Sequence, residues 1–127
     1  MQDKQSWIIE QVKHEVIDLV QNPHRLKKNY STYLAQKVGL EYHYFSSLFS
    51  STENITIEQY IILQKIERAK ELILYDEMSI SQIAKTMGYG SVSHLSNQFR
   101  KVTGLSPSHF KELRSEKRKM IDSVHES

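Results

Sequence analysis

Apolar residues recur every three or four positions along most of the chain, the spacing expected of helices that bury one face. The first such run includes Ile8, Val12 and Val16 and ends before Pro23. A sustained alternation of apolar and polar residues, the pattern of a half-buried strand, is not found. The 127 residues also include only four glycines and two prolines. The pattern therefore predicts an all-α fold.

Six further helices are predicted from N-cap patterns, glycines and helical spacing. Thr56 with Gln59, and Ser79 with Gln82, have the spacing of capping boxes. Ser106 is followed by a proline, which suits an N-cap and the first turn of a helix. The predicted ranges are about 31–38, 42–52, 56–75, 79–87, 92–102 and from 107 onward, which gives seven helices in all.

The chain also contains an internal repeat. The second copy follows the first at an offset of 49 residues up to a shared glycine and of 50 beyond it, so the second turn holds one extra residue. The matched pairs are Leu34 and Ile83, Ala35 and Ala84, Gly39 and Gly88, Phe45 and Leu95, Phe49 and Phe99, Asn54 and Gly104, Thr56 and Ser106, and Tyr60 and Phe110.

Each copy has the features of a helix-turn-helix. The alanine is small where two helices cross closely, and the glycine four residues later suits the positive φ of a tight turn. The next helix has two apolar anchors four residues apart, so its other faces are free to enter the major groove of DNA. We predict a single domain over 1–127, made of helix-turn-helix units at 8–55 and 77–115, a connecting helix at 56–76, and a basic, flexible tail at 116–127.

The connecting helix has a length that suits DNA. About 20 residues at about 1.5 Å each give a helix of about 30 Å. One turn of B-DNA is about 34 Å, so a single chain could place recognition helices in successive major grooves. We therefore expect the chain to bind its site as a monomer.

Charge is unevenly distributed along the chain. Residues 79–119 contain eight Lys or Arg and two Glu, whereas residues 30–60 contain one Lys and three Glu. The C-terminal third is therefore expected to supply most of the attraction for an anionic partner such as DNA.

Composition narrows the classes of function. The chain has no cysteine, which excludes disulfides and thiolate metal sites, and its longest apolar runs are four residues, too short to cross a membrane. The histidines are not spaced as metal ligands, and no catalytic triad or phosphate-binding loop stands out. We expect no metal, no cofactor and no enzymatic activity. The absence of a signal-like N-terminus favours the cytoplasm.

A specific signature occupies the second half of the chain. From Ile83 to Phe110 it reads I-A-x-x-x-G-Y-x-S-x-S-H-L-S-x-x-F-R-K-x-x-G-x-S-P-x-x-F. On these residues, and over about 8–115, the chain resembles the DNA-binding domain of the AraC/XylS family of bacterial transcription regulators. The resemblance implies seven helices, two helix-turn-helix units bridged by a long helix, and sequence-specific binding to promoter or operator DNA.

The resemblance also implies which residues contact DNA. Members of the family read bases from exposed positions of both recognition helices, which here are Tyr42, His43, Ser46 and Ser47 in the first and Val92, Ser93, Ser96 and Asn97 in the second. Asn97 could bond an adenine edge through two hydrogen bonds. The candidates for phosphate contacts are Ser31, Ser79, Ser91, Arg100 and Lys101.

The sequence departs from the family pattern mainly in the first unit. Positions 47 and 97 often carry arginine in relatives but hold Ser47 and Asn97 here, and a Phe49-Ser-Ser stretch replaces the frequent Phe-Lys-Lys. Because the first unit is also locally acidic, we expect the second unit to supply most of the affinity for DNA.

Two alternatives stay open on sequence alone. A helical interaction module could keep the fold without specific DNA binding, and the basic C-terminal third could bind nucleic acid without sequence preference. Substituting alanine for Asn97 and Ser93 distinguishes the interaction module from a DNA reader, because an interaction module should still bind its partner. Binding that depends on salt but not on DNA sequence would indicate the nonspecific binder.

RNA polymerase is a further candidate partner. Family members usually carry a sensing domain, so the chain is either part of a longer regulator or a regulator that acts alone.

Overall fold

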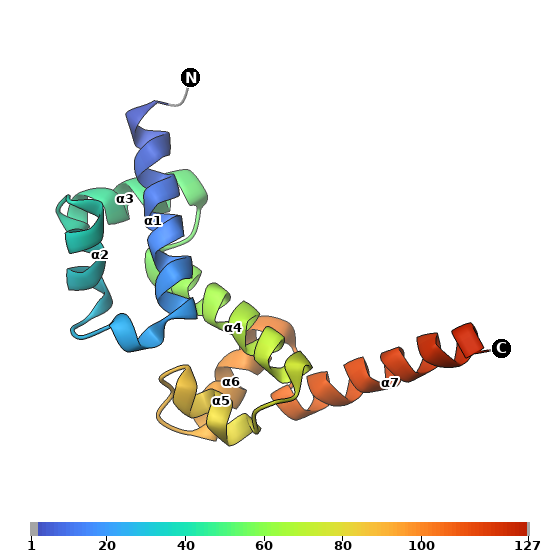
Figure 1. Cartoon of the computed structure of the whole chain (residues 1–127). Coiled ribbons are helices and arrows are strands. Elements are labelled where there is room, and N and C mark those ends of the chain that lie inside the picture. Colours follow the sequence, from blue (N-terminus) through green and yellow to red (C-terminus); the bar gives the residue numbers. More distant parts are fainter. Residues whose placement is uncertain (1–2, 127) are drawn as a thin grey trace. The chain divides into compact units, whose positions relative to one another are not determined.

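The structure is a computed structural model that describes residues 3–126, with residues 122–126 as backbone only. Over these residues the chain forms helices and no strands (Figure 1), which confirms the predicted all-α class with seven helices. A short 3-10 helix, η1 (Pro23–Arg25), follows the first helix. The α-helices are α1 (Lys4–Gln21), α2 (Tyr30–Val38), α3 (Tyr42–Glu53), α4 (Ile57–Tyr75), α5 (Ile80–Thr86), α6 (Val92–Thr103) and α7 (Pro107–Glu126).

The chain divides into two compact units, of which the first ends at Lys65 and the second begins at Ile66. The helix α4 therefore contributes residues 57–65 to the first unit and residues 66–75 to the second. Each unit contains one helix pair joined by a short turn, α2 with α3 in the first and α5 with α6 in the second.

The first unit is organised around α1, which contacts both α2 and α3. Asp3 is the N-cap of this helix, and its carboxylate accepts a hydrogen bond of 2.7 Å from the backbone N–H of Ser6. The predicted apolar face of α1 is confirmed, because Ile8, Val12 and Val16 are all buried. At the far end of α3, the Glu53 carboxylate forms an ion pair with Lys13 of α1.

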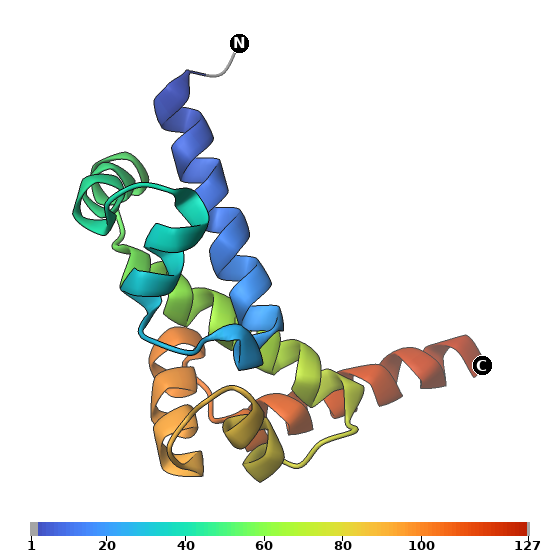
Figure 2. The same ribbon diagram turned by 60° about the vertical axis from the view of Figure 1, so that its left-hand side comes forward.

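The second unit repeats the core of the first. Leu95 and Phe99 of α6 are fully buried, as the repeat predicts. The ring of Phe99 packs edge-on against Phe110 with centroids 5.5 Å apart, and in the first unit Phe49 packs against Tyr60 at the same distance. The helices α5 and α6 contact each other and lie side by side in both views (Figures 1 and 2).

Both predicted capping boxes are present. The Gln59 N–H donates to Thr56 Oγ1 at 3.0 Å, and the Thr56 N–H donates back to the Gln59 side chain at 2.9 Å. The same reciprocal pair joins Ser79 and Gln82 at 3.1 and 2.8 Å. These bonds satisfy N–H groups that the first helical turn leaves without an intrahelical acceptor, and so they fix where α4 and α5 begin.

The turn between α5 and α6 depends on Gly88. Its φ of +81° lies in the left-handed region, its N–H donates to the carbonyl of Lys85 at 3.1 Å, and the N–H of Tyr89 donates to the carbonyl of Ala84 at 2.9 Å. These two bonds form a Schellman motif, which ends a helix when the residue after it is left-handed. A glycine adopts that conformation without the steric cost that a Cβ brings.

We expect Gly88→Ala to lower the free energy of unfolding by about 1–2 kcal/mol. A Cβ at this position would meet no atom within 4 Å, so the cost comes from backbone strain alone. Gly90→Ala is the matched control, because Gly90 lies two residues away, has equally open space and lacks a positive φ. Urea unfolding of both variants measures the difference, and equal losses would contradict the strain argument.

The last helix includes most of the segment that was predicted as a basic, flexible tail over residues 116–127. In the structure α7 continues through residues 116–126. Ser127 and the side chains of residues 122–126, among them His125, lie outside what the structure describes.

Candidate nucleic-acid interface

The helix α3 presents a small polar surface opposite its buried phenylalanines. His43 and Ser47 are exposed, whereas Ser46 is half-buried and its hydroxyl donates to the backbone carbonyl of His43 at 3.2 Å. His43 and Ser47 therefore offer the more accessible hydrogen-bonding groups among the predicted readers of this helix.

Tyr42, another predicted reader, makes contacts inside its own unit. Its hydroxyl donates to the Glu58 carboxylate at the start of α4 at 2.7 Å, and its ring packs edge-on against Phe45 with centroids 5.3 Å apart. Burial, together with the hydrogen bond to Glu58, raises the pKa of Tyr42, and the same hydrogen bond lowers the pKa of Glu58. In this arrangement Tyr42 joins the first turn of α3 to α4, so its polar tip already has a partner.

We expect Tyr42→Phe to destabilise the first unit by about 1 kcal/mol at about pH 7, because it removes a hydrogen bond to a charged group. The bond holds the pKa of Glu58 below its ordinary 4.5, so its contribution is complete above pH 4.5 and disappears as the pH falls through the folded-state pKa. The difference between wild type and variant should therefore shrink below pH 4.5 in urea unfolding.

The matched control for that substitution is Tyr44→Phe, since Tyr44 is an exposed tyrosine on the same helix. It should leave the free energy of unfolding unchanged to within about 0.5 kcal/mol. If Tyr42→Phe instead leaves stability unchanged and weakens DNA binding, Tyr42 reads DNA rather than supporting α3.

The helix α6 presents a more open face. Val92, Ser93 and Asn97 are exposed and Ser96 is half-buried, while Leu95 and Phe99 hold the opposite face in the core. None of the hydrogen bonds that the structure describes over residues 3–126 uses the side chain of Ser93 or of Asn97. The side-chain amide of Asn97 is therefore available to an external partner.

Neighbouring side chains stabilise the first turn of α6. Ser91 is its N-cap, and the Ser91 Oγ accepts a hydrogen bond of 3.0 Å from the N–H of His94. Tyr89, which is buried, donates its hydroxyl to the side chain of Gln98 and packs against the ring of His94 with centroids 5.1 Å apart. This cluster fixes the start of the helix without using the exposed positions 92, 93 and 97.

The predicted phosphate contacts fall into two groups. Arg100 and Lys101 are exposed in the last turn of α6, where a positive charge also interacts favourably with the helix dipole. The three serines have local roles instead. Ser79 and Ser91 are N-caps, and the Ser31 hydroxyl donates at 2.8 Å to Asn29, the residue that caps α2. Among the five candidates, only Arg100 and Lys101 have side chains without such a local role.

Sequence reasoning did not select Tyr44, although 49% of its surface is exposed on α3. It is the counterpart of His94 at the offset of 50 residues and lies three residues before Ser47, so it shares the exposed face of the helix. Helical periodicity together with the repeat was the signal that could have identified it.

Two other kinds of feature bear on function, namely a metal site and a membrane-spanning helix. Over residues 3–121, whose side chains the structure describes, no group of three or more His, Cys, Asp or Glu could hold a metal ion. Within the same range, no helix is both long and apolar enough to cross a bilayer.

The family of the chain follows from its match to known proteins. Residues 34–113, more than half of the chain, match the family described as "Helix-turn-helix domain". The chain belongs to the AraC-type helix-turn-helix family. This AraC-type domain is similar to the probable transcriptional regulator LumQ of Photobacterium leiognathi, with 31% identity over 102 residues that cover 80% of the chain and 41% of LumQ. It spans less than half the length of the curated relatives it matches.

Solved structures of AraC-type proteins share the fold. A transcriptional regulator from Chromobacterium violaceum with an AraC-type DNA-binding domain has a TM-score of 0.75 at 18% identity, and the match covers 86% of this chain and 93% of that one. The DNA-binding domain of AdpA, solved in complex with a target DNA, has a TM-score of 0.68 at 19% identity and covers 93% and 98%. At such identities the likeness shows the fold alone, whereas the match over residues 34–113 confirms the AraC-type family resemblance seen in the sequence.

Proposed function

We propose that the chain is a sequence-specific reader of double-stranded promoter or operator DNA that regulates transcription, with α3 and α6 as its recognition helices. The observation that carries this proposal is the face of α6, where exposed Asn97 lies one turn after exposed Ser93 and one turn before exposed Arg100 and Lys101. Such a face combines hydrogen-bonding groups for base edges with cations for phosphates. A relative with this fold, AdpA, is solved on its target DNA.

The roles within α6 follow from the chemistry of its side chains. Asn97 would accept from and donate to the edge of an adenine, and Val92 would contact a thymine methyl group. Ser93 and Ser96 would bond to either base edges or the backbone. Arg100 and Lys101 would set the register of the helix through phosphate contacts, which carry no sequence information of their own.

The first unit is proposed as the weaker reader. His43, Ser46 and Ser47 would contact bases, while Tyr42 is bonded to Glu58 in the structure. The helix α3 contains no Lys or Arg, whereas α6 contains two. Since phosphate contacts supply much of the affinity for DNA, the second unit is expected to bind first.

The remaining parts of the proposal concern assembly and place. One chain carries two helix-turn-helix motifs, which supports binding as a monomer to two half-sites. RNA polymerase is a proposed partner at the promoter, and a protein that acts on bacterial promoters is expected in the cytoplasm. No catalytic residue, metal or cofactor is needed. The family match does not favour the alternative of an interaction module that has lost DNA binding.

Selection from a random duplex library at about 150 mM salt, close to physiological ionic strength, tests this function. We expect two short conserved boxes about one helical turn apart, with the stronger box contacted by α6. A single box would assign a structural role to α3. No enrichment by the folded chain, or binding that depends on salt but not on sequence, would overturn the proposal.

A further inference from the structure

The helix α7 leaves the core soon after it begins. Every described residue from Glu112 to Ile121 is exposed, including Leu113, Met120 and Ile121, whose exposed fractions are 43%, 71% and 48%. Together with Phe110, these residues follow the spacing of an apolar stripe on a helix. A surface helix normally packs such a stripe against another element, and apolar residues gathered on a surface often mark a site of interaction.

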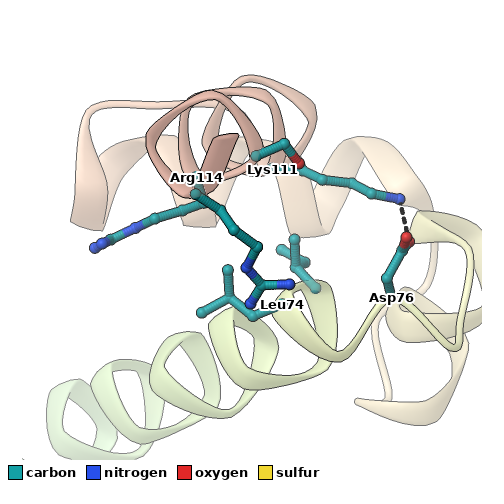
Figure 3. A pocket seen from close by; sticks show the side chains of 7 residues that line it. Leu74, Asp76, Lys111 and Arg114 are labelled. Carbon is teal, nitrogen blue, oxygen red and sulfur yellow. Dashed lines mark ion pairs between the residues drawn. The ribbon is translucent and has the colours of Figure 1, made fainter. Parts of the chain in front are cut away.

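A pocket lies beside this stripe, between the end of α4 and α7. It has a volume of about 70 Å³ and is lined by cationic side chains of Lys111, Arg114 and Arg118 (Figure 3). Lys111 reaches Asp76 at 2.6 Å, and Arg114 lies over the ring of Phe110 at 5.4 Å from the centroid. Among the residues whose side chains the structure describes, 3–121, no ion pair includes Arg114 or Arg118.

An apolar hollow adjoins the cationic pocket. It shares Leu74, Arg114 and Arg118 with the pocket and adds Lys117 and Ile121 from α7. Leu74 is itself exposed. The two hollows thus place guanidinium groups directly beside apolar side chains, and we call this surface the α4–α7 face, defined by Leu74, Arg114, Arg118 and Ile121.

The charge of the α4–α7 face decides what could cover it. Arg114 and Arg118 both lie on this face, so a second copy of the chain that used the same face would bring guanidinium groups together. A DNA backbone would satisfy the cations but would leave Leu74 and Ile121 without an apolar partner. An acidic amphipathic helix supplies carboxylates and apolar side chains at neighbouring positions, which matches both hollows.

We propose that the α4–α7 face binds an acidic amphipathic segment of a partner protein. A carboxylate of the partner enters the pocket beside Arg114 and Arg118, where charge-assisted hydrogen bonds are strong, and an apolar side chain packs between Leu74 and Ile121. The face uses none of the residues assigned to DNA on α3 and α6, so it adds a protein contact to the DNA contact.

A labelled synthetic peptide provides the probe. It has about 18 residues, or about five helical turns, with leucines at i, i+3, i+4 and i+7 spacing and glutamates at the flanking positions. Fluorescence anisotropy with the full chain should give a Kd on the order of 10 µM. A peptide of the same composition in scrambled order, and one with glutamine in place of glutamate, should bind at least about tenfold more weakly.

Variants of the chain locate the binding. Arg118→Glu is expected to weaken the peptide about tenfold, and Ile121→Ser about fivefold. Lys85→Glu is the matched charge control, since Lys85 is exposed on α5 and lines none of these hollows, and it should change the Kd by no more than about twofold. Ile121→Ser should also leave DNA binding unchanged.

Four results would overturn the proposal. They are a peptide that does not bind, a scrambled peptide that binds equally well, a loss of DNA affinity in Arg118→Glu that Lys85→Glu does not share, and a concentration-dependent dimer that Ile121→Ser abolishes. The third would assign the pocket to DNA phosphates, and the fourth would assign the face to a second copy of the chain.

Discussion

Asn97→Ala should weaken binding to the selected DNA by about 10- to 100-fold, the loss expected when a two-bond contact to a base is removed. Preference for adenine at one position of the stronger box should disappear together with the affinity. The free energy of unfolding should stay within about 0.5 kcal/mol of wild type, because Asn97 is exposed and makes no described contact. Titration of labelled duplexes with each base at that position measures affinity and preference together.

Ser47→Ala is the matched variant in the first unit, because Ser47 occupies the same place in α3 as Asn97 does in α6. It should reduce affinity by no more than about threefold, since a serine makes one weak contact at most. An equal loss in the two variants would show that the units share the affinity. If Asn97→Ala binds the selected DNA as tightly as wild type, α6 does not take part in base recognition.

Phe99→Ala should destabilise the second unit by about 3–5 kcal/mol, the cost of emptying a fully buried aromatic site. Phe99 also packs on Phe110, so the substitution removes this ring contact between α6 and the start of α7. Because a protein of this size has about 5–15 kcal/mol of stability in all, DNA binding should fall with the fold. Urea unfolding followed by circular dichroism measures the loss.

Two companion variants make that result specific. Phe49→Ala should cost as much in the first unit, because Phe49 is equally buried and packs on Tyr60 at the same ring distance. Val102→Ala, at an exposed position of α6, should cost less than about 0.5 kcal/mol. A loss below about 1 kcal/mol in Phe99→Ala would mean that α6 is not anchored as the repeat predicts.

Features that depend on neighbours in the sequence could be predicted without a structure. The capping boxes at Thr56 and Ser79, and the glycine turn at Gly88, involve residues within five positions of one another. The internal repeat then assigned the buried anchors, because two copies of one motif have the same core positions. The family signature includes the same residues. The repeat and the signature therefore agree because both depend on the core positions of the helix-turn-helix.

Features that depend on contacts between distant positions were not found from the sequence. The bond from Tyr42 to Glu58 spans 16 residues, and an exposed-looking tyrosine gives no sign that its hydroxyl is used. The capping residue of α2 was also not identified from the sequence. Asn29 and Ser31 are both good caps, and only the geometry shows that Asn29 accepts from Thr32.

The residues of the turn before α6 affect how the protein could acquire new DNA targets. In that turn Ser91 caps α6 and Tyr89 bonds to Gln98 of the same helix. The exposed side chains at positions 92, 93 and 97 are therefore not needed to hold α6 in place. In α3, by contrast, the capping residue makes no side-chain bond, and Tyr42 supports the first turn. Mutations that change the DNA sequence recognised by α6 should therefore lower the free energy of unfolding very little. Divergence toward new operators should begin in the second unit.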